Sequence, residues 1–177
     1  MKRLSIAVLG LLLAAGCSSS SSTPSSSTAG TTTTRFTATL SPAQETPAAI
    51  TGPEAAGSGT ATMDFNITRD ASGTITAATV NFTATVQNLP ATSVVNIAHI
   101  HTGATGVGGP ILISTTVVPG EVVLTGGAGT FTRVGVPVPS PTAANMQSIL
   151  DNPAGFYFNI HTAANPGGVM RGQLVKQ

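Results

Sequence analysis

The chain has 177 residues, which suits one domain of ordinary size. The sequence contains seven basic and six acidic residues, and charged residues make up only 7% of it. Lys2 and Arg3 lie in a segment that we expect to be cleaved, so the mature chain has five basic and six acidic residues and a net charge of −1. A chain without a basic stripe cannot neutralise phosphates, and this composition argues against binding to nucleic acid.

The first sixteen residues have the parts of a secretory signal peptide. Lys2 and Arg3 give a positive start, and the apolar run from Leu4 to Leu13 is too short to span a bilayer. The residues LAAGC at 13–17 resemble the bacterial lipobox, in which cleavage leaves the cysteine as a lipidated N-terminus. We therefore expect 1–16 to be a lipoprotein signal peptide and Cys17 to carry the acyl chains. The alternative is an ordinary secretory signal with a cysteine there by chance.

Cys17 is the only cysteine in the chain, so its lipidation would leave the domain without a disulfide, a thiolate ligand or a Cys nucleophile. Fourteen of the seventeen residues at 18–34 are Ser or Thr. Such a segment buries too little surface to fold, and we expect 17–34 to be a flexible tether between the lipid bilayer and the domain. If the cell is Gram-negative, Ser18 directly after Cys17 favours sorting of the lipoprotein to the outer membrane.

Residues 35–177 form the predicted domain, in which short strands alternate with turns rich in Gly, Pro and Asn. The clearest period-2 pattern covers residues 60–68, and a hairpin turn follows at 69–73. Ile75 and Ala77 are out of step with the next strand, which predicts a bulge near Ala77–Ala78. The predicted strands cover residues 36–40, 60–68, 78–86, 94–101, 111–116, 121–124, 129–134, 155–162 and 169–175.

Residues 140–150 depart from the strand pattern and predict one short helix near 141–151. Ser140 is a candidate cap, Pro141 comes early, and apolar residues stand at 146, 149 and 150. Strands with one apolar and one Thr-rich face predict an all-β fold. We expect an antiparallel, Greek-key-like sandwich or flattened barrel.

All three histidines fall in two related phrases, AHIHTGATGVGGP at 98–110 and FNIHTAANPGGVMRGQL at 158–174. His99 and His101 are two apart on a predicted strand, so their side chains share one face. In the second phrase Tyr157, Asn159 and His161 share the polar face of another strand. If these strands are neighbours, three imidazoles meet.

A His-x-His pair with a third histidine is a known way to hold copper or zinc. The alternative is that His99, His101 and His161 hydrogen-bond to the backbone of the turns that follow them. A shared ion requires imidazole nitrogens roughly 3–4 Å apart. No fourth ligand is evident, although Asn159 and Glu121 are candidates.

The two phrases resemble the CHRD domain, a module named after chordin and found in bacterial secreted proteins. The resemblance covers nearly all of 35–177. In chordin these modules accompany regions that bind secreted growth factors. The resemblance therefore implies little about an activity of the domain itself. Val169–Met170 departs from the family pattern, which often has an acidic residue there, and this argues against an acidic partner for Arg171 at this point. Arg171 is a candidate ion-pair partner on the last strand or a contact residue, and the structural role is favoured. The matching positions are Gln44, Glu45, Pro47, His99, His101, Gly103, Gly106, Gly109, Pro110, Asn159, His161, Asn165, Pro166, Gly168, Arg171, Gly172 and Leu174.

Three functions remain open. The first is a membrane-anchored, non-catalytic domain that binds a partner such as an extracellular protein. The second is a copper- or zinc-binding lipoprotein that uses His99, His101 and His161. The third, a metal-dependent enzyme, is the least favoured. The His-x-His strand is similar to that of copper–zinc superoxide dismutase, but this chain lacks that enzyme's cysteines and full ligand set.

Overall fold

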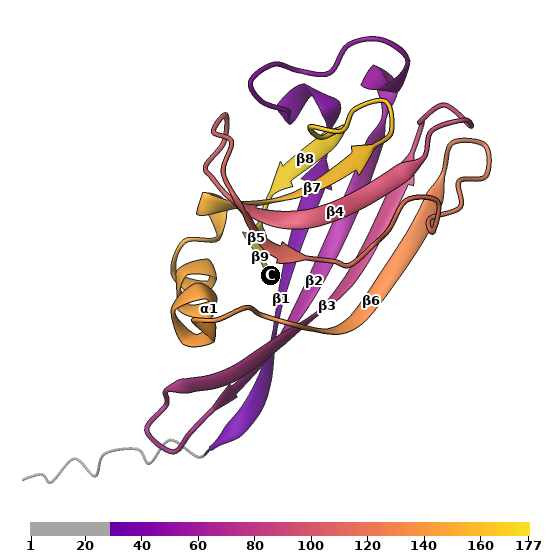
Figure 1. Ribbon diagram of the computed structural model, residues 1–177. Helices are drawn as coiled ribbons and strands as arrows, with labels where there is room; N and C mark the ends of the chain where they lie inside the picture. Colours follow the sequence, from indigo (N-terminus) through magenta and orange to yellow (C-terminus); the bar gives the residue numbers. More distant parts are fainter. Residues whose placement is uncertain (1–28) are drawn as a thin grey trace, which may run out of the picture.

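Strands with one apolar face build a two-layered molecule. The computed structural model describes residues 29–177, so the predicted signal peptide, Cys17 and most of the predicted tether lie outside the described residues. The strands pair antiparallel throughout this region, as Figure 1 shows. The first sheet has the order β6-β3-β2-β1-β9 and consists of β1 (Gly30–Leu40), β2 (Ser58–Arg69), β3 (Ile75–Gln87), β6 (Gly129–Pro137) and β9 (Val175–Lys176).

The second sheet is smaller and packs across the upper part of the first (Figure 1). Apart from an isolated bridge between Ser41 and Arg171, no ladder joins the two sheets in the described region, so the fold is a sandwich rather than a flattened barrel. The strand order of this second sheet is β5-β4-β7-β8, with β4 (Val95–Thr102), β5 (Ile111–Ser114), β7 (Phe156–Thr162) and β8 (Met170–Gln173).

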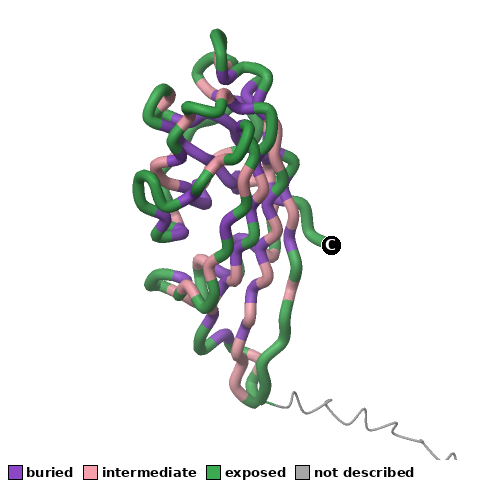
Figure 2. The backbone as a smooth tube through the Cα atoms, turned by 90° about the vertical axis from the view of Figure 1, so that its right-hand side faces the viewer, coloured by how far each residue is buried: buried purple, intermediate pink, exposed green. Residues whose placement is uncertain are grey.

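The core lies between the two sheets. Buried residues alternate with less buried ones along the long strands, as Figure 2 shows for the whole backbone. The Phe82 ring of β3 meets the Phe158 ring of β7 across the layers, with centroids 5.9 Å apart. The one α-helix within residues 29–177, α1 (Thr142–Asp151), contributes Met146 and Ile149 to the same core.

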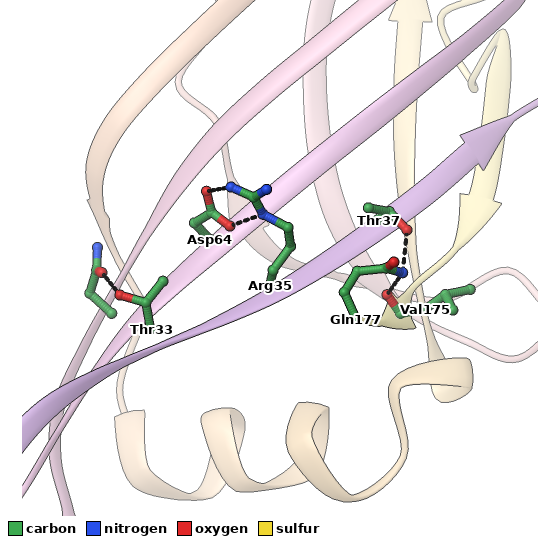
Figure 3. Close-up of polar contacts among 7 residues, drawn as sticks. Thr33, Arg35, Thr37, Asp64, Val175 and Gln177 are labelled. Carbon is green, nitrogen blue, oxygen red and sulfur yellow. Dashed lines mark hydrogen bonds and ion pairs between the residues drawn. The ribbon is translucent and has the colours of Figure 1, made fainter.

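The outer face of the five-stranded sheet is polar and rich in threonine. The strand register places Thr37, Thr62, Thr83 and Thr132 side by side. Arg35 forms an exposed two-pronged ion pair with Asp64 on the neighbouring strand, at 2.7 and 2.8 Å (Figure 3). Gln177 donates to the Thr37 hydroxyl at 2.8 Å and so fastens the C-terminus to β1 (Figure 3). Such cross-strand contacts each stabilise the sheet modestly.

Most of the predicted elements are confirmed, with shifts of a few residues. The turn at 69–73 is present, and the ladder between β2 and β3 is irregular where Thr68 pairs with Ala77 and Arg69 with Ile75. This irregularity lies beside the predicted bulge. The predicted strand at 169–175 is divided, because β8 belongs to the second sheet and β9 to the first.

Three details of the sequence interpretation are wrong. Residues 30–34, assigned to the tether, form the start of β1 because they pair with 65–69 of β2. Residues 121–124 are not a strand, because no neighbouring strand pairs with them along their length. Ser140 does not cap the helix: Pro141 occupies the cap position and makes no side-chain cap bond there. In addition, no helix within 29–177 is long and apolar enough to cross a bilayer.

Replacing Phe82 tests the packing of the two layers. Phe82→Ala leaves a cavity at the contact with Phe158, and we expect it to lower the free energy of unfolding by about 3–5 kcal/mol. Val134→Ala is the control, because Val134 is exposed on edge strand β6 and its loss should change stability by less than about 0.5 kcal/mol. Urea denaturation followed by circular dichroism measures both. Equal effects of the two changes would contradict this packing.

Candidate metal centre

The three histidines meet on the outer face of the four-stranded sheet. Strands β4 and β7 are antiparallel neighbours, and their register pairs His99 with Asn159, His101 with Tyr157 and Ile97 with His161. Because side chains alternate along a strand, Ala98 and Ile100 enter the core while His99 and His101 face away from it. One nitrogen from each of the three rings lies within 4.8 Å of the other two. The predicted meeting of three imidazoles is therefore present.

Although this face points away from the core, the three rings are buried. His99, His101 and His161 are only 5, 8 and 7% exposed. The loops at 103–110 and 163–168 fold over them, and each loop accepts a hydrogen bond from a histidine beneath it. His101 Nδ1 lies 3.0 Å from the Gly109 carbonyl oxygen, and His161 Nδ1 lies 2.9 Å from that of Pro166.

These two hydrogen bonds determine which nitrogen of each ring is free. A carbonyl oxygen can only accept, so Nδ1 of His101 and of His161 carries the hydrogen. Their Nε2 atoms are left with lone pairs, and both are buried without a hydrogen-bond partner among the described residues. Nδ1 of His99 is buried without such a partner as well. An N–H bonded to a backbone carbonyl is the usual outer-shell contact of a metal-binding histidine.

Burial keeps the imidazoles neutral. Burial, reinforced by the neighbouring His161 and His101, lowers the pKa of His99 to about 4. Burial also lowers the pKa of His101 and of His161, although their bonds to Gly109 and Pro166 act in the opposite direction. Neutral imidazoles keep the lone pairs that a metal ion needs.

A stack of three planar groups supports one side of the cluster. The His101 ring stacks on Tyr157 with centroids 4.9 Å apart and planes 6° apart. The guanidinium carbon of Arg171 lies 3.4 Å from the centre of the Tyr157 ring. Arg171 is 1% exposed, and its guanidinium donates to neutral acceptors on Thr46, Ala104, Val107 and Gln173. It is therefore a contact residue that fastens two loops to β8.

Asn159 and Glu45 are two further buried polar residues beside the cluster. Asn159 stands in β7 between His99 and Arg171 in the register, and its Oδ1 is buried without a partner among residues 29–177. Glu45 and Asn159 both lie against Gly168, whose φ is +132° and whose missing Cβ would meet the Asn159 amide at 2.6 Å and the Glu45 carboxyl at 2.9 Å. Burial raises the pKa of Glu45 to about 7, against the opposing charge of Arg171.

Glu54 holds the loop that orients His161. Its buried carboxylate accepts hydrogen bonds from Thr162 Oγ1 at 2.6 Å, from Asn165 Nδ2 at 2.5 Å and from Ser93 Oγ. Burial acts to raise its pKa, but these bonds outweigh it and the pKa is lowered. No local pattern in the sequence indicates this role of Glu54, because its partners lie 39 to 111 residues away.

The cluster is slightly wider than a closed metal site. The nitrogens lie no more than 4.8 Å apart, and an equilateral triangle with sides of that length has its centre about 2.8 Å from each corner, so each ring would move by at most roughly 0.7 Å to form bonds of ~2.1 Å. Asn159 Oδ1 and Glu45 Oε1 are buried oxygens on this face without hydrogen-bond partners among the described residues. Glu121, the other fourth-ligand candidate, forms an ion pair with Arg133 of the other sheet and is not part of the cluster.

The fold and the site define a class of protein: an antiparallel β-sandwich with a buried histidine cluster on the outer face of its smaller sheet. The model of the CHRD domain family matches residues 36–174, and the chain belongs to this family. This confirms the resemblance that the two histidine phrases indicate. No curated protein and no solved structure shows a significant match to the chain.

The pKa shifts predict how stability depends on pH. The histidines have lowered pKa values, so the unfolded chain binds protons that the folded chain does not, and stability is lost as the pH falls from 6.5 towards 4. The shift of His99 from 6.5 to about 4 corresponds to on the order of 3 kcal/mol. The raised pKa of Glu45 acts oppositely: it contributes stability that is full below pH 4.5 and is lost as the pH rises through 7.

Because Glu45 offsets part of the stability that the histidines lose on acidification, we expect Glu45→Gln to show the pH dependence of the histidines alone. Thermal unfolding in metal-free buffer from pH 7 to 4.5 should show a steeper loss of Tm on acidification in this variant than in the wild type. Asp151→Asn, at the exposed end of α1, is the control and should keep the wild-type slope. A slope in Glu45→Gln that is equal to or shallower than that of the wild type would contradict the assignment.

Proposed function

We propose that this protein is a membrane-anchored, non-catalytic lipoprotein of the cell envelope, and that its CHRD domain binds a copper or zinc ion through His99, His101 and His161. The observation that carries the proposal is the set of three buried imidazole nitrogens without hydrogen-bond partners among the described residues. Leaving a buried polar atom unpartnered costs about 1–3 kcal/mol, and a bound ion removes that cost.

The alternative, a purely structural role for the histidines, accounts for only two of their six ring nitrogens. It explains the bonds of the two Nδ1 atoms to Gly109 and Pro166. It gives no partner to Nε2 of His101 or of His161, which the same two loops bury. A metal ion would use both nitrogens of His101 and of His161, one directly and one through its outer-shell contact with Gly109 or Pro166.

The shape of the surface favours binding over catalysis. A hollow of about 380 Å³ lies beside residues 163–165 and is lined by Pro53, Glu54, Pro90 and Ser93, but by none of the three histidines. Because the imidazoles are covered by loops, an organic substrate cannot reach an ion held there without displacing those loops. A small ion needs a much smaller opening.

Direct metal titration tests the binding role. The full chain with Cys17→Ser, which removes the only thiol, should take up one equivalent of copper or zinc at micromolar free metal. His161→Asn should lower the affinity at least tenfold, because an asparagine amide can replace Nδ1 as donor to Pro166 but offers no ligand in place of Nε2. Isothermal titration calorimetry and elemental analysis measure both.

The control for that experiment is Arg35→Ala, a change on the outer face of the other sheet, which should bind metal as the wild type does. If the folded protein takes up neither copper nor zinc, the metal-binding function is wrong. The structural role of the histidines, with an extracellular protein as the partner, then stands in its place.

The anchor has its own test. Supplied with labelled palmitate, cells expressing the full chain should yield a labelled protein in the membrane fraction. Cys17→Ser should be unlabelled and leave that fraction, because the lipobox resemblance assigns the acyl chains to this residue alone. Ser18→Ala is the matched control and should remain labelled. Label retained by Cys17→Ser would show that the anchor lies elsewhere or is absent.

A further inference from the structure

We propose, resting on the metal-binding function above, that the three-histidine site selects a monovalent cuprous ion over divalent copper and zinc, and that the buried charge of Arg171 contributes to this preference. Four features of the site bear on this: the charge of its ligands, its burial, the position of Arg171 and the number of its donors.

The ligands bring no negative charge. His99, His101 and His161 form the cluster without any carboxylate or thiolate among the described residues. Glu45, a buried acid that lies against Gly168 together with Asn159, does not belong to this group. An ion held by three neutral imidazoles therefore keeps its full charge, which is one unit for a cuprous ion and two for a cupric or zinc ion.

Burial penalises the larger charge. The three donor nitrogens lie beneath the loops at 103–110 and 163–168, and the rings are more than nine-tenths buried. The cost of taking an ion out of water rises with the square of its charge, so a dication without anionic ligands loses about four times as much hydration free energy as a monocation of equal size.

Arg171 adds a fixed positive charge beside the site. Its guanidinium stacks on Tyr157, and Tyr157 stacks in turn on His101, so the charge lies directly behind a ligand. Its hydrogen bonds go to Thr46, Ala104, Val107 and Gln173, and none of these acceptors is a carboxylate. The repulsion between this charge and a bound ion doubles when the ion is divalent.

The donor count points the same way. A zinc ion held by three histidines completes its tetrahedron with a water molecule, and cupric ions prefer tetragonal sets of nitrogen and oxygen, so each dication needs at least one donor more than three imidazoles. Here three nitrogens converge, and the buried oxygens without hydrogen-bond partners on this face are the neutral Asn159 Oδ1 and Glu45 Oε1, which does not belong to the group. A closed-shell cuprous ion tolerates three-coordination, so of the three ions it has the least need of ligands beyond the three imidazoles.

Competition experiments test the preference. The full chain with Cys17→Ser is titrated anaerobically with cuprous ion against bicinchoninate, and separately with cupric and zinc ions against chelators of known affinity. We expect the Kd for cuprous ion to be at least a hundredfold lower than for either dication. For copper, this ratio corresponds to a reduction potential of the bound ion about 120 mV above that of the free couple, at 59 mV per tenfold.

Two variants isolate the charge of Arg171. Arg171→Met removes the charge and should reduce the cuprous-to-cupric affinity ratio about tenfold. Arg171→Lys keeps the charge while losing the fork of hydrogen bonds, and should retain the ratio even if its Tm falls. A merely structural role would make the two variants alike, which would remove Arg171 from the proposal.

The outcomes are separable. If a dication binds as tightly as the cuprous ion or more tightly, the monovalent preference is wrong while the metal-binding function stands. If the folded chain binds none of the three ions, both fail. Should both Arg171 variants fail to fold, the wild-type affinity ratio still decides the monovalent preference.

Discussion

The antiparallel pairing of β4 with β7 is the constraint on which the rest of the site depends. Side chains alternate along both strands, so a slip of one residue would send His161 into the core and turn Phe158 outwards. The apolar residues that fill the sandwich therefore also fix the histidines on the opposite face. Packing and site assembly are enforced by the same register.

A second consequence follows from the loops that cover this face. Polar groups on an outer sheet face normally meet water, yet here Arg171 and Glu54 hold the loops at 103–110 and 163–168 over the imidazoles. Each of these two charged residues is buried and satisfied by several hydrogen bonds, which offsets the cost of its desolvation. The cover removes water from the cluster and keeps the imidazoles neutral.

The sequence alone predicts the β-sandwich, the helix and the three histidines, because all of these leave periodic or repeated patterns in short segments. It does not predict that β4 and β7 are neighbours, since nothing local to either strand encodes that pairing. Glu54 stands in a short 3-10 helix, and its buried contacts arise only when residues 93, 162 and 165 come together. Glu45 likewise meets Gly168 only in the folded chain. Thr31–Thr34 look like a tether because they lack apolar residues, but hydroxyl and backbone contacts to β2 are enough to order them.

The early start of β1 also determines how the domain responds to force. All eleven residues of β1, from Gly30 to Leu40, pair with β2. A pull on Gly30 directed along this strand would load the whole ladder in shear instead of opening it one pair at a time. In a domain held through its N-terminus, such tension would enter through eleven paired residues that lie far along the chain from the histidine loops.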